Sequence, residues 1–168
     1  WVNQAQRDHF DFVIKMREHG IEVFELHNLL TEILQNPTAR KWILDRKINA
    51  NQIGTGLSHE IYSWLENLTP RKLAEFLIGG VVADDITSQE DNKLFTAYCD
   101  YLGHSNFLIP PLPNTIFTRD TTSWIYGGVT LNPMYWPARR QETLLTNAVY
   151  KFHPVFANTT FDIWYGNP

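Results

Sequence analysis

The hydrophobic pattern of the chain changes character twice along its length. Residues 1–27 read as a helix followed by a strand, which is one half of an α/β unit. Residues 28–103 show only helical periodicity, and strand patterns return in residues 104–168. This order predicts an α/β fold interrupted by an inserted helical bundle. We therefore expect three stretches: the start of an α/β portion (1–27), a helical insertion domain (28–103) and the resumed α/β portion (104–168).

The first stretch opens with a predicted helix over residues 3–19, for which Gly20 is a suitable end. A strand is predicted next, from the apolar residues Ile21, Val23, Phe24 and Leu26. The strand that precedes such a helix in an α/β unit is missing, and the chain opens at Trp1 rather than Met. We therefore expect the sequence to be part of a longer chain.

Local capping signals place about five helices in the insertion. Asn36-Pro37 and Thr69-Pro70 each combine a capping side chain with a proline at the first helical position. Ser58 is the expected cap of another helix. Gly79-Gly80 and Gly103 are each expected to end a helix. Residues 84–92 are the expected polar linker.

Strands and one long helix are predicted after residue 103. Gly127-Gly128 separates two apolar runs and is a two-residue hairpin signal. A long helix should start at Pro137 and end before His153-Pro154. The predicted strands are Phe107–Ile109, Ser123–Tyr126, Val129–Leu131 and Phe161–Tyr165.

Composition argues against several classes of protein. The chain has 14 Lys and Arg against 18 Asp and Glu, a net charge of −4, whereas binders of nucleic acid or anionic membranes carry a basic excess. No apolar run approaches the about 20 residues of a membrane span. The single cysteine, Cys99, excludes a disulfide within this sequence and favours a reducing compartment, so we expect a cytoplasmic protein. Cys99 lies in a predicted helix, where a buried and inert thiol is expected.

The sequence carries no motif for a metal or a cofactor. Its six histidines include no i, i+4 pair of the kind that binds zinc from one helix face. Gly54 and Gly56 lack the Lys-Ser/Thr that follows them in a phosphate-binding loop. We therefore expect neither a metal nor a cofactor.

Residues 110–142 concentrate charged side chains among aromatic ones, a composition typical of a desolvated polar pocket. In such a pocket Asp120 would receive a cation, and Arg139 or Arg140 would grip a carboxylate through a bidentate fork. A ligand that is cationic at one end and anionic at the other, such as an amino acid, fits this pattern.

Simpler structural roles for the same charges stay open at this point. Asp120 can pair with its neighbour Arg119 or cap a turn. Arg139 and Arg140 can lie on a solvated helix face, and Glu142 can merely offset the dipole of that helix.

Several separated segments of the sequence together resemble one known family. They are Pro113-Asn114, Phe117-Thr118-Arg119-Asp120, Met134, Arg139 with Glu142 three residues later, and the longer runs WVNQAQRDHF, NLLTEIL and WPARRQETLLTNAVYKFHP. In this order they resemble the arginine deiminases of bacterial type. The resemblance implies a member of the guanidino-group-modifying superfamily, whose fold is a five-bladed α/β propeller (pentein). Arginine deiminases add a helical insertion to it, so a portion of that propeller with an inserted helical bundle is expected here.

The resemblance also implies an activity, the hydrolysis of L-arginine to L-citrulline and ammonia in arginine catabolism, without metal or organic cofactor. In the family a Cys thiolate attacks the guanidinium carbon, a His relays protons, and two Asp carboxylates hold the guanidinium. Asp120 matches the first of these carboxylates. Asn114 and Arg139 match residues that hold the α-carboxylate of the substrate. Phe117 matches a residue that packs on the aliphatic stem, and Glu142 resembles a partner of that arginine.

The nucleophilic Cys, the catalytic His and the second Asp of the family have no match in this sequence, and Cys99 does not match the nucleophile. We therefore expect the chain to be inactive by itself. The family resemblance also leads us to expect that the full-length protein is a homo-oligomer. One alternative is a catalytically inactive amino-acid-binding or interaction module of the same fold. Another is a related agmatine or dimethylarginine hydrolase, disfavoured because those relatives lack the helical insertion and agmatine has no carboxylate for Arg139.

Overall fold

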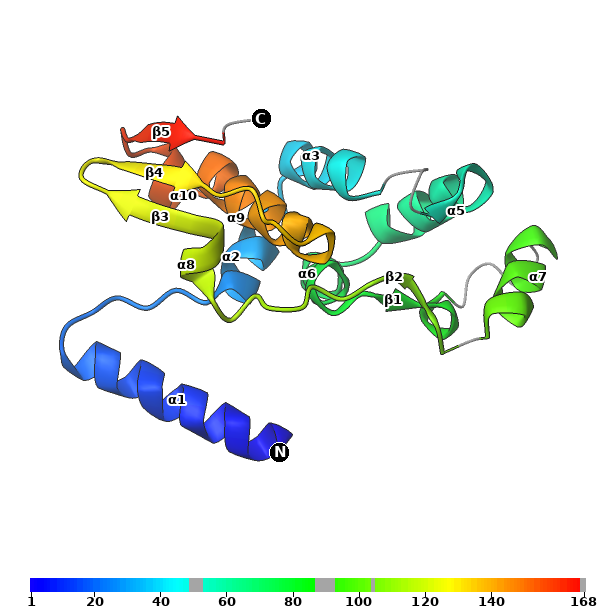
Figure 1. Cartoon of the computed structure of the whole chain (residues 1–168), viewed down its shortest axis with the longest axis horizontal. Coiled ribbons are helices and arrows are strands. Elements are labelled where there is room, and N and C mark those ends of the chain that lie inside the picture. Colours follow the sequence, from blue (N-terminus) through cyan, green and yellow to red (C-terminus); the bar gives the residue numbers. More distant parts are fainter. Residues whose placement is uncertain (49–52, 87–92, 104, 167–168) are drawn as a thin grey trace.

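The computed structural model of the chain describes residues 1–48, 53–86, 93–103 and 105–166, and it has a mixed α/β structure rich in helix (Figure 1). The helices are α1 (Val2–Glu18), α2 (Leu26–Ile33), α3 (Pro37–Lys47), α5 (Thr55–Glu66), α6 (Pro70–Gly79), α7 (Lys93–Leu102), α8 (Thr118–Thr121), α9 (Arg140–Phe152) and α10 (Pro154–Ala157). The strands are β1 (Val81–Val82), β2 (Phe107–Ile109), β3 (Thr122–Ile125), β4 (Gly128–Leu131) and β5 (Asp162–Tyr165). Single turns of 3₁₀ helix include η1 (Ala83–Asp85) and η3 (Pro137–Arg139). Within the described ranges, no helix combines the length and the apolar character that crossing a bilayer requires.

Two of the predicted helix caps, Asn36 and Thr69, are confirmed, and in each the hydrogen bond lies within the first helical turn. Asn36 Oδ1 accepts a hydrogen bond from the N–H of Thr38 at 2.9 Å, at the start of α3. Thr69 Oγ1 accepts one from the N–H of Lys72 at 3.4 Å, at the start of α6. Helix α6 is capped by Gly80, whose φ of +81° and close approach to the carbonyl of Ile109 leave no room for a Cβ.

One three-stranded sheet lies at one end of the molecule. Strands β3 and β4 form the predicted antiparallel hairpin, and β5 joins β4 in parallel, so that α9 and α10 make the crossover between β4 and β5. The turn residues are Tyr126-Gly127 rather than the predicted Gly127-Gly128, and Tyr126 takes a φ of +54°. Gly128 belongs to β4, where it pairs with Ile125 and Asp162, and a Cβ there would lie 2.6 Å from the carbonyl oxygen of Asp162.

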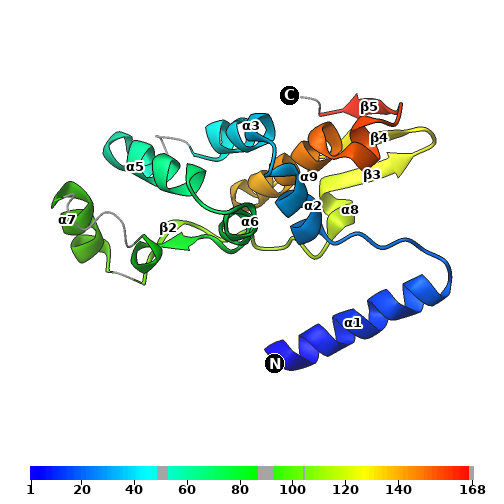
Figure 2. The ribbon, with the colours of Figure 1, turned by 180° about the vertical axis from the view of Figure 1, so that it is seen from behind.

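Helix α9 lies at the centre of the packing. It contacts α2, α3 and α10 (Figures 1 and 2), and its buried face joins the same hydrophobic core as α2, α3, α5, α6 and α7. The core residues from these helices include Leu30, Ile33, Ile43, Leu44, Leu73, Leu77, Leu145, Ala148 and Val149. The helical bundle and α9 therefore fold against each other, which fixes the N-terminal turn of α9 relative to the loop before it.

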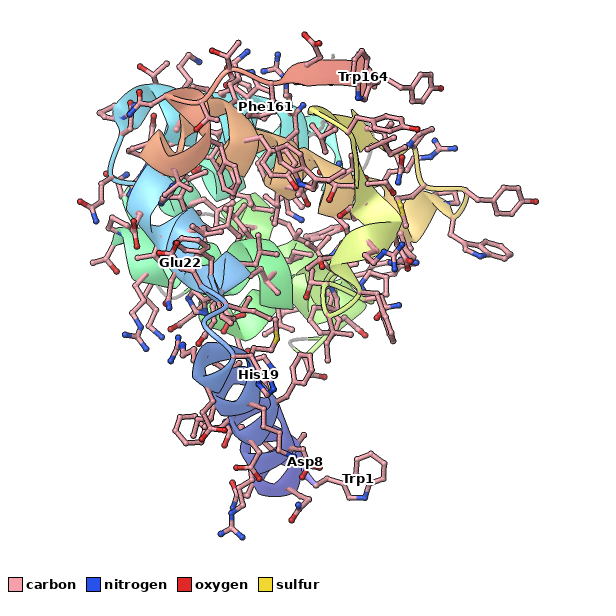
Figure 3. The ribbon with its side chains drawn as sticks, turned by 90° about the vertical axis from the view of Figure 1, so that its left-hand side faces the viewer. Trp1, Asp8, His19, Glu22, Phe161 and Trp164 are labelled. Carbon is pink, nitrogen blue, oxygen red and sulfur yellow. The ribbon has the colours of Figure 1, made fainter. Side chains whose placement is uncertain are left out.

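The strand predicted over residues 21–26 is wrong. Residues 21–25 form an irregular connection, and Leu26 already begins α2. A strand needs a partner for its backbone groups, and here Ile21 and Phe24 are exposed. Figures 1 and 3 show the connection leading to α1, which projects from the body with Trp1 at its free end.

Two predictions within the insertion also need correction. The helix expected to start at Ser58 begins at Thr55, so Ser58 lies inside it and Gly54 takes the capping position. The stretch expected to be only helical contains β1, which pairs antiparallel with β2 through Val81 and Ile109. Residues 87–92 of the expected linker lie outside the described residues, as does the side chain of Cys99.

Candidate active site around Arg139

Three segments distant in sequence converge at the N-terminal end of α9. The proline-rich loop after β2 carries Asn114, α8 carries Asp120, and the junction of η3 and α9 carries Arg139 and Glu142. The helix expected to start at Pro137 begins there as a 3₁₀ turn, and regular α-helix starts at Arg140. This tighter turn places Arg139 at the cap of α9, one residue before the α-helix.

Glu142 is the buried anchor of this group. It is 2% exposed. Its Oε2 accepts from Nη2 and Nε of Arg139 at 2.8 and 3.1 Å, and its Oε1 accepts from Nε of Arg139 at 3.2 Å. The same Oε1 accepts the backbone N–H of Asn114 at 3.0 Å. Glu142 therefore ties the loop, the turn and the helix together, which is more than the dipole compensation that its position alone indicates.

Arg139 joins two carboxylates. Its Nη1 donates to Oδ2 of Asp120 at 2.9 Å, while the opposite edge of the guanidinium faces Glu142. Its Nη2 also lies 3.5 Å from the carbonyl oxygen of Asn114. The hydrogen bonds with Glu142 first, and with Asp120 second, raise the pKa of Arg139 above its usual range, so the guanidinium stays charged.

Asp120 is the exposed member of the group. Its side chain is 44% exposed, against 17% for that of Arg139. Its ion pair is with Arg139, 19 residues away, and the structure gives it none with the adjacent Arg119. With two carboxylates and one guanidinium, the group carries an excess of one negative charge near the surface. That charge and exposure suit a cationic ligand at Asp120.

Asn132 is a residue of this region that the sequence reasoning missed. Its Nδ2 donates to the backbone carbonyl of Asp120 at 3.1 Å, and its own N–H donates to the carbonyl of Thr121 at 2.8 Å. Thr130 Oγ1 in turn donates to Oδ1 of Asn132 at 2.9 Å. Asn132 thereby fixes α8 to the end of β4, and its only sequence signal is a polar residue placed directly after a buried strand.

Phe117 lies in the same loop, at the capping position of α8. Its side chain is 60% exposed. Its backbone N–H donates to the carbonyl of Asn114 at 3.4 Å, and its own carbonyl accepts from the N–H of Asp120 at 3.2 Å. Phe117 is therefore connected to both residues through the backbone, while its ring lies at the surface.

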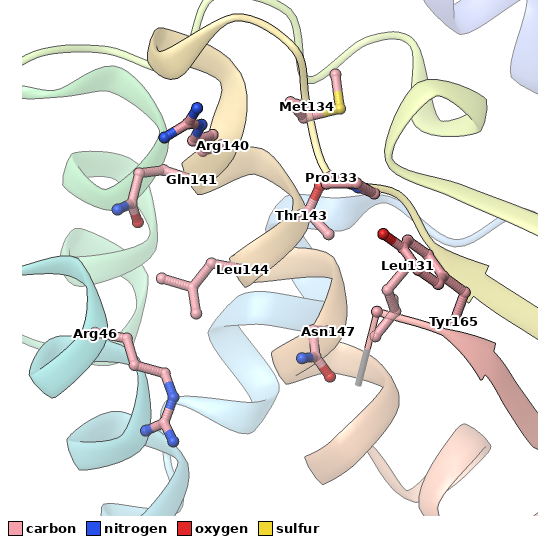
Figure 4. A pocket seen from close by; sticks show the side chains of 11 residues that line it. Arg46, Leu131, Pro133, Met134, Arg140, Gln141, Thr143, Leu144, Asn147 and Tyr165 are labelled. Carbon is pink, nitrogen blue, oxygen red and sulfur yellow. The ribbon is translucent and has the colours of Figure 1, made fainter. Parts of the chain in front are cut away.

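Arg140 faces a different part of the molecule from Arg139. It lines a cavity of about 590 Å³ together with Arg46, Leu144 and Tyr165. Figure 4 shows this cavity, with Arg140 and Gln141 on one side and Leu131 and Tyr165 on the other. The two adjacent arginines thus differ: Arg139 is held by carboxylates, and Arg140 borders a large open cavity.

The chain matches one known protein family. The sequence model of the family described as arginine deiminase matches residues 1–168, which is the whole chain. The match therefore includes both the helical stretch and the segment that carries Asn114, Asp120, Arg139 and Glu142. The chain belongs to the arginine deiminase family.

Proposed function

We propose that this chain supplies the arginine-binding part of an arginine deiminase active site, where L-arginine and water give L-citrulline and ammonia. The family match supports the substrate, and the convergence of Asn114, Asp120, Arg139 and Glu142 supports the place. The observation that carries the proposal is the ion pair of Asp120 with Arg139, because it brings an exposed carboxylate next to a guanidinium held from behind.

The two ends of arginine match the two members of that pair. Asp120 would hold the guanidinium of the substrate, and Arg139 would hold its α-carboxylate with the edge that Glu142 leaves free. Asp120 and Arg139 now touch at 2.9 Å, which is much shorter than an arginine side chain. Binding therefore requires the pair to separate, and each charge then regains an opposite partner from the substrate.

Glu142 lowers the free-energy cost of this separation for Arg139. Its carboxylate contacts Nε and Nη2, so Arg139 keeps those hydrogen bonds when Nη1 leaves Asp120. Asn114 would add a contact to the same carboxylate end, and Phe117 would cover the aliphatic stem by turning its exposed ring inward. These roles are proposals drawn from the family resemblance and from the positions of the residues.

The wider proposal follows the family. The chain would form a portion of a five-bladed α/β propeller with residues 28–103 as the helical insertion domain, in a cytoplasmic homo-oligomer. The Cys nucleophile, the proton-relaying His and the second Asp would come from residues that this sequence does not match, and no metal or cofactor would take part.

In both the proposed enzyme and the alternative of an inactive amino-acid-binding module, Cys99 is not the nucleophile. The only cysteine of the sequence, Cys99, belongs to α7, and α7 lies at the end of the molecule opposite α8 and the sheet (Figures 1 and 2). Cys99 is therefore badly placed to attack a guanidinium that Asp120 holds.

Calorimetry with L-arginine, combined with an assay for citrulline, tests the proposal. We expect the 168-residue chain to bind L-arginine without releasing citrulline, and the full-length gene product to release it. A full-length product that binds arginine without turnover would support the inactive module instead. Absence of arginine binding in both proteins would overturn both readings.

A further inference from the structure

Asn132 follows β4 directly and connects α8, β4 and α9 through hydrogen bonds. Its backbone N–H donates to the carbonyl of Thr121 in α8 at 2.8 Å, and its backbone carbonyl accepts from Oγ1 of Thr143 in α9 at 2.8 Å. On its side chain, Nδ2 donates to the carbonyl of Asp120 at 3.1 Å, and Oδ1 accepts from Oγ1 of Thr130 in β4 at 2.9 Å. Because a backbone carbonyl can only accept, these partners hold the amide of Asn132 in one orientation.

The two backbone groups of Asp120 are held in different ways. Its N–H donates to the carbonyl of Phe117 at 3.2 Å, within the same turn of chain. Its carbonyl accepts from Nδ2 of Asn132, which lies 12 residues further along the chain. Of these two bonds, only the one with Asn132 ties the backbone of Asp120 to another element of the fold.

This tie matters most when the ion pair of Asp120 with Arg139 opens. In the free protein, Nη1 of Arg139 also holds the carboxylate of Asp120, whose side chain is 44% exposed. In the proposed complex Arg139 has left it, so the direction of the carboxylate depends on the backbone of α8. Helix α8 is a single turn of four residues, which has little stability of its own. The amide of Asn132 then fixes the backbone from which the carboxylate points.

We propose that Asn132 is a positioning residue for the guanidinium end of the substrate. Its amide holds the backbone of Asp120, so that the carboxylate meets the guanidinium in the orientation that the reaction requires. A displacement of about 1 Å at a reacting centre lowers the rate about 10²-fold, so this hydrogen bond affects turnover as well as stability. The inference rests on the proposed function, because it assigns Asn132 a role only if Asp120 holds the guanidinium.

Replacement of Asn132 in the full-length enzyme tests this role. Asn132→Leu has a similar shape but neither donor nor acceptor, and we expect it to lower kcat/KM for arginine about tenfold or more. Most of the loss should appear in kcat, because Arg139 still binds the carboxylate end of the substrate. Agmatine should lose the same factor, so the ratio of the two kcat/KM values, measured by ammonia release, should stay that of the parent. A ratio that falls as in Arg139→Lys would overturn the proposal.

Asn132→Asp adds a pH signature, because its new carboxyl group donates a hydrogen bond only when it is protonated. At about pH 8 an ionised carboxylate would face the carbonyl oxygen of Asp120 and repel it. In mild acid the protonated group donates to that carbonyl. The nearby charges, the carboxylates of Asp120 and Glu142 against the single guanidinium of Arg139, also favour the protonated form.

We therefore expect the activity of Asn132→Asp, relative to the parent at the same pH, to rise several-fold from about pH 8 to about pH 5. Asn132→Leu should stay at a constant fraction of the parent. Each variant is assayed at a temperature at which its melting curve shows it folded. Identical relative pH profiles for the two variants would overturn the proposal.

A matched control makes the same change at a distant asparagine. Nδ2 of Asn67 also donates to a backbone carbonyl, that of Ser63 at 2.8 Å, at the end of α5. Asn67→Asp should keep the activity of the parent at both pH values. An equal loss in Asn67→Asp would show that the effect is not specific to Asn132.

Thr130→Val tests the same role without touching Asn132. Valine suits a strand such as β4, but it lacks the hydroxyl that donates to Oδ1 of Asn132. The amide keeps its bond with Asp120 but loses the partner that fixes its orientation, so we expect kcat/KM to fall about threefold. If neither variant of Asn132 folds, Thr130→Val decides, and activity equal to that of the parent would overturn the proposal.

Asp120→Ala in the same assay separates this inference from the proposed function. If Asp120→Ala loses about 10³-fold while Asn132→Leu keeps the activity of the parent, the arginine site stands and Asn132 has only a structural role. If Asp120→Ala itself keeps that activity, both the proposed place of the guanidinium and the role of Asn132 are wrong.

Discussion

Arg139 donates from Nη1 to Oδ2 of Asp120 at 2.9 Å, although the two residues lie 19 positions apart on different helical segments. In the proposed substrate complex both residues are needed at opposite ends of one arginine molecule. The ion pair therefore holds both side chains oriented before the substrate arrives, and in the proposal the substrate replaces it with two ion pairs. This exchange is the basis of the first two predictions.

Removal of the Asp120 carboxylate should abolish most of the activity of the full-length enzyme. We expect Asp120→Ala to lower kcat/KM about 10³-fold or more, because both positioning and charge stabilisation of the guanidinium are lost. Citrulline release measures the effect, and the variant must show the same melting curve as the parent. Asp162→Ala, at an exposed position of β5, is the control. Activity within a few-fold of the parent would give Asp120 a purely structural role.

Replacement of Arg139 by Lys should remove discrimination between arginine and agmatine, which differs from it only by lacking the carboxylate. A lysine cannot reproduce the planar fork, so we expect arginine to lose about tenfold or more in kcat/KM and agmatine much less. The ratio of the two kcat/KM values is the measurement. Arg140→Lys should keep the parent's ratio. If the ratio instead falls in Arg140→Lys, Arg140 is the residue that binds the substrate carboxylate.

Loss of the Glu142 charge should destabilise the fold as well as the site. In Glu142→Gln the amide NH₂ faces the N–H groups of Arg139, so we expect a loss of about 2 kcal/mol in the free energy of unfolding. Urea denaturation measures it. Glu75→Gln, which changes an exposed ion pair with Lys72 on α6, should have a much smaller effect. Equal effects of the two substitutions would contradict the anchoring role of Glu142.

Arg40 joins the ends of two helices, and its replacement tests how the helical stretch is held together. Its Nη1 donates to the carbonyls of Glu66 and Leu68 at 2.6 and 3.0 Å, and its Nε donates to that of Leu34 at 3.2 Å. Arg40→Lys cannot span these carbonyls and should lower the free energy of unfolding by about 1–2 kcal/mol. Arg71→Lys, whose side chain is 79% exposed, should unfold at the same urea concentration as the parent.

Burial of Lys47 should make the chain more stable in mild alkali. Its folded-state pKa of about 8 lies below its ordinary value of 10.5, so between these pH values the unfolded chain binds more protons. Stability should therefore rise with pH above about 8, and the burial penalty, about 3 kcal/mol, is fully present below that. Burial and a hydrogen bond with Asp45 raise the pKa of Tyr62 to about 12, so its opposing effect begins only near pH 10.

Thermal unfolding of the parent and of Lys47→Met between pH 7 and pH 10 measures this effect. The variant should melt at a higher temperature at pH 7 and should lack the rise above pH 8. A parent chain whose stability is flat over this range, or a variant that melts lower at pH 7, would show that Lys47 is not buried as a charge.

The sequence determined the features that one or two turns of chain can encode. Asn36 and Thr69 cap α3 and α6 as their positions before proline predict, and the hairpin of β3 and β4 follows its glycine signal to within one residue. The alternation of helical and strand patterns also gave the mixed α/β class. These signals are local, since the donor and the acceptor of each hydrogen bond lie within a few residues of each other. Water is therefore the main alternative partner for either group.

The tertiary structure decided everything that depends on a distant partner. Ile21, Val23 and Phe24 look like part of a strand, but no strand in the described part of the chain pairs with them. The two residues of β1, in contrast, form a strand because β2 lies beside them. Nothing near Asp120 in the sequence indicates that its partner is Arg139 rather than Arg119, or that Glu142 reaches back to Asn114. A charge takes the partner that the packed chain brings within hydrogen-bond distance, and the packing of α9 on α2 and α3 sets that distance.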